Sequence, residues 1–403
     1  MSFLSLDQLK TGMVTIADVL DANGQLLLPA GKEMESSHLR KFKASGIAGA
    51  DVKEEDDTST GENNLELLET AKHYCIPFFK QMDMNQPVMR ELFRQAVLYN
   101  SQQKISVKAH IKLPGETDSQ PCEPVADWQR HLSRSNIKLP ESPGIVDELN
   151  EVISNPFAVA DDIAKIVNQS PGLAASLLKI VNSSFYGFPA TIDSISRAVT
   201  LIGTREVKNL ALGITAMNSF KGIENNLLNV KSFISHSIAC GVISRILAVQ
   251  AGIPKAEQLF VSGLLHDVGR LIIYKYFPAH AVQIFKTADA SGSPMFKSEK
   301  PFLGARHTRI GAFILEEWKL PQTIIDNVRY HHNPMSAPDA SPAAIVHLAD
   351  VIVNALGIGS SGQRGIAEFD PKVFDHLELP TTVFEEVVSQ ATPQLAVFES
   401  IID

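Results

Sequence analysis

The sequence predicts a mainly α protein with a small β-containing unit at its N-terminus. Apolar residues such as Ile163, Ile166 and Val167 follow the i, i+3, i+4 spacing that buries one face of a helix. This spacing is dense from Asp127 onward, and strand signals are nearly absent from there to the C-terminus. We therefore expect the chain from about residue 130 to its end to be almost wholly helical.

Strand signals are confined to the N-terminal part of the chain, which we expect to form a separate β/α unit at residues 1–53. Two short strands, at 14–19 and 25–28, flank the dipeptide Asn23-Gly24, which favours a hairpin turn. A short helix is expected after the second strand.

The remaining chain divides into three parts. Residues 54–128 are expected to be an acidic linker followed by a helical segment, in which Pro77 and Pro87 break the helix. Residues 129–350 form the main helical domain, and residues 351–403 form a C-terminal helical segment. A length of 403 residues is sufficient for these domains and for a large buried core.

Several helix starts are marked in the main domain. Ser170 followed by Pro171 combines a good N-cap with proline at the first helical position. Asp193 and Thr204 are expected to be further N-caps, since their side-chain oxygens can accept from the first free backbone N–H groups of a helix.

The chain is acidic, with a formal net charge of -9 at pH 7. Such a chain does not attract nucleic acid or an anionic membrane surface, so we expect neither as a partner. The first residues lack the basic and apolar regions of a signal peptide. The most apolar stretch, residues 343–358, contains His347, Asp350 and Asn354, so no membrane span is expected. These features favour a cytoplasmic protein.

The three cysteines, Cys75, Cys122 and Cys240, lie far apart and form no CxxC pair. This spacing indicates neither a disulfide framework nor a zinc knuckle. We therefore do not expect Cys240 among the ligands of a metal site, and its replacement by alanine should leave such a site intact.

Histidine and aspartate gather in the second half of the chain. Neutral imidazole and carboxylate are the ligands that iron, manganese, zinc and nickel accept. A single histidine is more often a surface or helix-capping residue, but adjacent pairs at 266–267 and 331–332 favour a shared centre. The candidate metal ligands are His236, His266, Asp267, His307, His331, His332 and Asp350.

Two groups of motifs carry a resemblance to a known family. The first comprises LPESP at 139–143, QSPGL at 169–173, LLKIVNSSFYG at 177–187 and IDSISRAVTLIG at 192–203. The second comprises GLLHDVGR at 263–270, His307 with Gly311, WKLP at 318–321 and HHNP at 331–334. In this order, over roughly residues 130–350, the motifs resemble the HDOD domain, a relative of the HD and HD-GYP metal phosphohydrolases. The resemblance implies an HD-like, all-helical HDOD domain at 129–350 in a bacterial-type signalling protein.

The resemblance also implies a metal centre. In metal-bearing HD proteins, the positions that match the candidate ligands hold two metal ions, and the aspartate that matches Asp267 bridges them. One ion would be held by His236, His266 and Asp350, and the other by His307, His331 and His332. The expected cofactor is a divalent metal with room for two ions. Iron or manganese is favoured, and zinc or nickel stays open.

Three departures from the enzymes of this superfamily bear on catalysis. The loop after the histidine pair reads NPM at 333–335 and lacks the GYP triplet with which HD-GYP enzymes recognise cyclic dinucleotides. Arg270 replaces the usual lysine of the HD motif, and its planar fork holds a phosphate differently. Ser232 stands where three-metal enzymes carry glutamate, so a third metal is not expected. The catalytic residues are unknown, with Asp267 and Arg270 as candidates.

Two functions of different classes remain open. The departures favour a regulatory signal-transduction protein with a bound metal centre and no robust catalysis, whose partners are other signalling proteins. The complete ligand set favours the alternative, a metal-dependent phosphohydrolase or phosphodiesterase acting on a nucleotide or cyclic dinucleotide. A nucleotide or phosphate ligand therefore also stays open.

Overall fold

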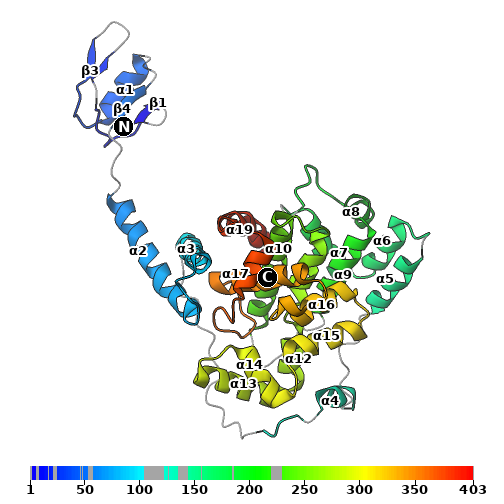
Figure 1. Cartoon of the computed structure of the whole chain (residues 1–403). Coiled ribbons are helices and arrows are strands. Elements are labelled where there is room, and N and C mark those ends of the chain that lie inside the picture. Colours follow the sequence, from blue (N-terminus) through cyan, green and yellow to red (C-terminus); the bar gives the residue numbers. More distant parts are fainter. Residues whose placement is uncertain are drawn as a thin grey trace. The chain divides into compact units, whose positions relative to one another are not determined.

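The structure is a computed structural model, and it describes residues 2–5, 9–16, 18–20, 25–45, 47, 49–52, 58–103, 122–125, 127–134, 144–155, 157–183, 186–218 and 229–402. Two compact units are formed by Met1–Thr70 and Ala71–Asp403 (Figure 1). The expected domain limits at residues 53, 128 and 350 stay predictions.

The described residues of the N-terminal unit form two small antiparallel strand pairs, one helix and the first part of a second helix. Strand β1 (Ser2–Ser5) pairs with β4 (Gly49–Val52), and β2 (Val19–Leu20) pairs with β3 (Leu26–Leu28). Helix α1 (Ser36–Ala44) lies between β3 and β4 in the chain. The prediction of a small β-containing N-terminal unit is therefore confirmed.

A small apolar core holds this unit together. Met34 and Phe42 are almost fully buried in it, together with Val19, Leu28 and Val52 from the strands. The expected Asn23-Gly24 turn lies outside the described residues. Helix α2 (Thr58–Cys75) begins soon after β4, so helix occupies residues 58–62 of the expected acidic linker, which spans about residues 51–62.

The second unit consists of helices, and its described residues contain no strand, which confirms the expected mainly α fold. After α2 come η2 (Ile76–Phe79), α3 (Pro87–Gln102), α4 (Trp128–Arg134), α5 (Gly144–Ser154), α6 (Ala160–Asn168), α7 (Pro171–Val181), α8 (Ile195–Ile202), α9 (Thr204–Asn218), α10 (Val230–Gln250), α11 (Ala256–Leu265), α12 (Val268–Tyr276), α13 (Pro278–Ser291), α14 (Met295–Leu303), α15 (His307–Glu317), α16 (Gln322–Tyr330), η3 (Pro334–Ser336), α17 (Ala340–Leu356), α18 (Pro371–Leu377) and α19 (Val383–Ile402).

Of the three expected N-caps, Ser170 is right, whereas Asp193 and Thr204 are not caps. Ser170 caps α7 by accepting a hydrogen bond from the third residue of the helix, and Pro171 occupies its first position. Asp193 is not the cap of α8, because the neighbouring Ser194 accepts the equivalent hydrogen bond. Thr204 is the first residue of α9. Both Asp193 and Ser194 can cap a helix, so the backbone path decides between them.

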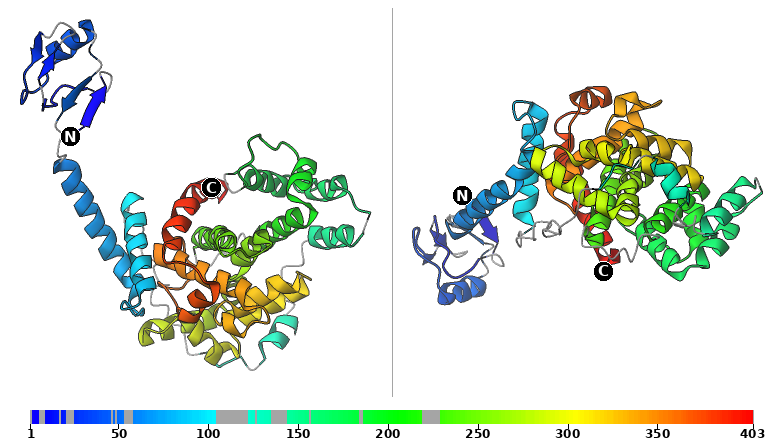
Figure 2. Two further views of the ribbon diagram at one scale, coloured as in Figure 1. Left: turned by 45° about the horizontal axis from the view of Figure 1, so that its top comes forward. Right: turned by 90° about the horizontal axis from the view of Figure 1, so that it is seen from below.

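Two apolar cores lie within the second unit. Helices α5 to α9 enclose the smaller core, which includes Ile163, Leu177 and Val199. Helices α10 to α19, with α2 and α3, contribute to the larger core. Figure 2 shows α5 to α8 gathered on one side of the second unit, away from the later helices drawn in orange.

Helix α10 forms the centre of the larger core and packs against α11, α17 and α19. Among the described residues it is the one helix that is long and apolar enough to cross a membrane. Because 67% of its most apolar window is buried inside the protein, core packing accounts for that composition.

Glycines allow the helices that carry the candidate ligands to approach closely. A Cβ atom on Gly263 of α11 would lie 2.5 Å from the carbonyl oxygen of Cys240 on α10. A Cβ atom on Gly269 of α12 would lie 2.7 Å from the backbone nitrogen of Gly311 on α15. No larger residue fits at either contact without moving a backbone. These two contacts bring together the helices around the candidate site.

Candidate metal centre

Each candidate ligand lies on, or directly beside, a helix of the larger core. His236 lies within α10, His266 follows α11, Asp267 precedes α12, His307 begins α15, His331 and His332 follow α16, and Asp350 lies within α17. All are buried except His332, which is half-buried. Residues more than one hundred positions apart are thereby brought into one cluster.

Asp267 lies at the centre of this cluster. Its Oδ2 atom is 3.3 Å from Nε2 of His266 and 3.8 Å from Nε2 of His236. Its Oδ1 atom is 3.0 Å from Nε2 of His307 and 3.8 Å from Nε2 of His331. The two oxygens of one carboxylate therefore face two different groups of histidines, which is the arrangement expected of a bridging ligand.

The first donor group lies on the Oδ2 side of Asp267. Oδ1 of Asp350 is 3.3 Å from Nε2 of His236 and 3.5 Å from Nε2 of His266. The Sγ atom of Cys240, one helical turn after His236, is 3.7 Å from the same Nε2 atom. The structure thus places Cys240 in the group, whereas the sequence analysis left it out.

The second donor group consists of three histidines on the Oδ1 side. Nε2 of His307 and Nε2 of His331 are 3.3 Å apart. The ring of His332 lies 4.2 Å from that of His331 and 5.1 Å from that of His307, measured between centroids. One donor atom from each of the three lies within 4.8 Å of the others. The grouping implied by the resemblance is therefore present in the folded chain.

Several backbone and side-chain acceptors fix the orientation of the imidazoles. Nδ1 of His266 lies 2.7 Å from the carbonyl oxygen of Gly263, and Nδ1 of His331 lies 2.8 Å from that of Val328. Since a carbonyl can only accept, Nδ1 carries the proton in both rings. With Nδ1 as the donor, Nε2 of each ring faces the cluster and can bind a metal once that ring is neutral, as is usual for metal-bound histidine.

Glu299 is a second residue that the sequence analysis missed. It is fully buried, and its carboxylate accepts hydrogen bonds from the backbone N–H and from Nδ1 of His307, at 2.7 and 2.8 Å. A carboxylate that orients a histidine in this way is a common neighbour of metal ligands. Its position eight residues before His307 follows no spacing rule, so only the fold reveals it.

Arg270, a candidate catalytic residue, is held inside the protein. Its side chain is 2% exposed, with Nε 3.2 Å from Oδ1 of Asp267. Its guanidinium also donates a hydrogen bond to Oγ of Ser361 at 2.9 Å. The carbonyl of Ser361 in turn accepts a hydrogen bond from the Tyr274 hydroxyl at 2.6 Å. Arg270 therefore offsets one negative charge of the cluster and ties it to the loop after α17.

Burial and mutual attraction set the protonation of the cluster. Burial alone would raise the pKa of Asp267, but Arg270 and His266 hold it well below its ordinary value. Burial opposes protonation of His266, yet the neighbouring carboxylates, Asp267 foremost, raise its pKa to about 10. Burial and the neighbouring imidazoles hold the pKa values of His331 and His332 well below the ordinary value. His331 and His332 are therefore neutral, as a metal ligand must be.

The residues present fit a divalent metal. Three polar atoms of the cluster are buried and have no hydrogen-bond partner of acceptable geometry among the described residues. They are Nε2 of His266, Oδ1 of Asp267 and Nε2 of His332. Buried polar atoms without partners are costly, and one cation can satisfy several of them together. The imidazole and carboxylate donors suit the divalent transition metals.

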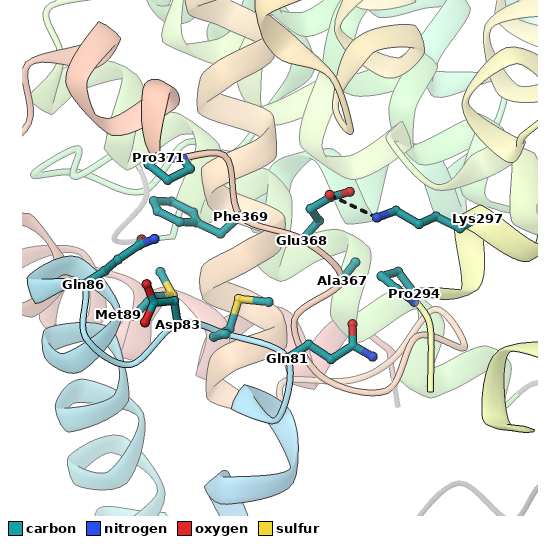
Figure 3. A pocket seen from close by; sticks show the side chains of 11 residues that line it. Gln81, Asp83, Gln86, Met89, Pro294, Lys297, Ala367, Glu368, Phe369 and Pro371 are labelled. Carbon is teal, nitrogen blue, oxygen red and sulfur yellow. Dashed lines mark hydrogen bonds and ion pairs between the residues drawn. The ribbon is translucent and has the colours of Figure 1, made fainter. Parts of the chain in front are cut away.

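A separate cavity of about 320 Å³ lies apart from this cluster. Its lining comes from the η2–α3 turn, the start of α14 and the loop before α18, and it includes the ion pair between Lys297 and Glu368 at 3.1 Å (Figure 3). None of the candidate metal ligands lines this cavity.

Comparison with known proteins agrees with the motifs and the fold. The HDOD domain model matches residues 139–334. An uncharacterized protein of Treponema pallidum (strain Nichols) is 26% identical over 202 residues, which are 50% of this chain and 39% of that protein. The match thus spans about two-fifths of the length of that relative.

Solved structures show the same fold. An HDOD domain protein with unknown function from Geobacter sulfurreducens is 23% identical, with a TM-score of 0.51, and covers 65% of this chain and 88% of its own. A presumed phosphohydrolase from Shewanella amazonensis SB2B is 21% identical, with a TM-score of 0.55. The match covers 68% of this chain and 98% of that protein. A presumed signal transduction protein from Marinobacter aquaeolei VT8 is 21% identical, with a TM-score of 0.54. The match covers 80% of this chain and 67% of that protein. The ordered motifs, the matching family model and the shared helical fold together show that this chain contains an HDOD domain at residues 139–334.

Proposed function

We propose that this chain is a regulatory signal-transduction protein that acts through its HDOD domain, with a bound metal centre and without robust catalysis. Its partners would be other signalling proteins. Two proteins with the same fold have names that correspond to this proposal and to its main alternative. One is a presumed signal transduction protein, and the other is a presumed phosphohydrolase.

The observation that carries the proposal is the burial of the cluster away from solvent. Asp267 is 2% exposed and Arg270 is 1% exposed, and the two are paired with each other. A phosphate would have to reach this buried pair for Arg270 to contact it directly. Hydrolysis also needs the phosphate in line with the attacking oxygen, and an error of about 1 Å costs roughly a hundredfold in rate.

A metal centre in this place would stabilise the fold. Its ligands would come from α10, α17 and the ends of α11 and α16, with further donors at the starts of α12 and α15. A metal that binds only the folded chain would therefore tie together helices distant in sequence. When bound, two such ions also supply Lewis acidity and an activated water, which keeps the enzymatic alternative open.

The alternative is a metal-dependent phosphohydrolase, and the placement of Asp267 favours it. The two oxygens of this carboxylate face separate donor groups, as in the two-metal sites of phosphatases and nucleases. A nucleotide or phosphate ligand would then bind on the side of the half-buried His332.

Turnover assays test the choice. The metal content of purified protein is measured first, and the protein loaded with iron, manganese or zinc is then offered cyclic di-GMP and simple phosphodiesters. We expect bound metal and little or no turnover. Robust hydrolysis that disappears in Asp267→Ala would replace the regulatory proposal with the enzymatic one.

A further inference from the structure

Cys240 lies among the donors of the first group. Its Sγ atom and one donor atom each of His236, His266 and Asp350 all lie within 4.8 Å of one another. All four side chains are buried, and Cys240 itself is fully inaccessible to solvent. This set of two imidazoles, one carboxylate and one thiol differs from the set of imidazoles and carboxylates that the motifs implied.

The helix geometry explains why the thiol points to this place. Cys240 follows His236 by four residues on α10, so the two side chains lie on one face of the helix. That face meets α11, where Gly263 lets the backbone approach the carbonyl of Cys240. The same Gly263 accepts the hydrogen bond from His266 that turns Nε2 of that ring toward the cluster.

Three of the distances between donors have the lengths expected when both atoms bind one zinc ion. Bond lengths of about 2.0–2.1 Å to nitrogen and oxygen and about 2.3 Å to sulfur put tetrahedral donors roughly 3.4 Å apart for an N–O pair and 3.6 Å for an N–S pair. The structure has 3.3 and 3.5 Å between Asp350 and the two histidines, and 3.7 Å between Cys240 and His236.

We infer that Cys240 is a further protein ligand of the metal held by His236, His266, Asp350 and the bridging Asp267, and that this position selects zinc over manganese. The inference rests on the proposed metal centre and names one of its ligands. Thiolate is a soft donor that favours zinc, whereas manganese prefers oxygen ligands. The thiol proton leaves to solvent when the sulfur binds the metal, because a coordinating thiol is deprotonated.

The charge of the cluster also favours a thiolate. Asp267, Asp350 and Glu299 carry three negative charges, against one positive charge on Arg270 and four on two divalent ions. A thiolate at Cys240 adds a fourth negative charge to the buried group. Since buried charge is costly unless it is compensated, this donor brings the filled site closer to neutrality.

Cobalt substitution tests the inference through a readout that is independent of activity. Cobalt(II) added to metal-free protein gives a sulfur-to-metal charge-transfer band in the near ultraviolet only if a thiolate binds it. We expect this band in the parent protein and its loss in Cys240→Ser. Zinc affinity at this position should fall at least tenfold in Cys240→Ser, since even the loss of a supporting residue costs about 10–100-fold.

Cys75→Ser and Cys122→Ser are the matched controls. Cys75 is as fully buried as Cys240, but its thiol contacts Asn100 and belongs to no metal-donor group among the described residues. Both control variants should keep the charge-transfer band. If the band disappeared in a control and persisted in Cys240→Ser, the assignment of the ligand would be wrong.

Failure of the inference and failure of the metal centre give different results. Cobalt that binds without a charge-transfer band leaves the metal centre in place and overturns the role of Cys240. A protein that is folded by circular dichroism yet binds no cobalt overturns both. If Cys240→Ser does not fold, X-ray absorption at the zinc edge of the parent protein decides, because a sulfur ligand scatters at about 2.3 Å. Scattering by nitrogen and oxygen alone would reject the thiolate.

Discussion

Glu299 accepts hydrogen bonds from both the backbone N–H and Nδ1 of His307, at 2.7 and 2.8 Å. This carboxylate fixes the position of the first residue of α15 and the tautomer of its ring. Nε2 of His307 is thereby directed at Oδ1 of Asp267, 3.0 Å away. The geometry of the second donor group thus depends on a residue that is not itself a donor in it.

Replacing this carboxylate should weaken metal binding without removing a ligand. In Glu299→Gln we expect affinity for the second metal to fall about 10–100-fold, since a residue that orients a ligand is worth this much. Calorimetric titration of metal-free protein measures the change. Glu316→Gln, at an exposed position of α15, is the control and should bind metal as the parent does. Equal affinity in both variants would contradict the role of Glu299.

Loss of the central carboxylate should empty the whole cluster. Asp267→Ala is expected to bind neither metal, because this side chain faces both donor groups. The parent should be stabilised by about 2.7 kcal/mol when free metal is 100-fold above its dissociation constant, and the variant should gain nothing. Metal analysis after dialysis and thermal unfolding with and without metal report both effects. The control is Asp375→Ala, at an exposed position of α18, which should bind metal as the parent does. Metal retained in Asp267→Ala would disprove the bridging role.

Much of this arrangement could be predicted from the sequence, for local reasons. Helix spacing and the cap at Ser170 depend on neighbouring residues, and the ordered motifs identified the histidines and aspartates. Cys240 and Glu299 were missed because each acts through a contact that exists only after helices pack. Arg270 was expected to be available for a phosphate, but its partner Ser361 lies 91 residues later and draws it into the core.

The close approach of α12 and α15 should not tolerate a side chain. Gly269→Ala would place a Cβ atom 2.7 Å from the backbone nitrogen of Gly311, and closer still to the carbonyl of His307. We expect a loss of about 1–3 kcal/mol in the free energy of unfolding, together with weaker metal binding. Denaturant unfolding measures the first effect.

A second glycine gives the matched control for this substitution. A Cβ atom on Gly172, near the start of α7, would meet nothing within 4 Å. Gly172→Ala should therefore stabilise the protein by about 0.5–1 kcal/mol, because alanine loses less backbone entropy in a helix. If both alanine variants had the same stability, close packing at Gly269 would not be the cause.

Glu206 should make stability depend on pH outside the metal centre. Burial, and then the nearby Glu257 carboxylate, raise the pKa of Glu206 above its ordinary value of 4.5. The folded state therefore holds this proton more tightly than the unfolded state does. Its contribution to stability is complete below pH 4.5 and is lost as the pH rises through the folded pKa.

The test compares Glu206→Gln with the parent across pH. The variant should be the more stable protein at pH 7, and its advantage should disappear as the pH falls below 4.5. Denaturant midpoints at several pH values measure this. Glu317→Gln, at an exposed position of α15, should show no such trend. A Glu206→Gln advantage that grew on acidification would have the wrong sign.

The central place of α10 has a consequence for how the chain is made. Its partners α17 and α19 are synthesised roughly one hundred residues later, so the apolar faces of α10 leave the ribosome long before their cover exists. Nascent chains with such surfaces are prone to aggregate. A fragment that ends at residue 334, the limit of the matched family domain, would keep α10 but lack both partners. The smallest part of this protein that can be produced on its own therefore extends well beyond the motifs by which it is recognised.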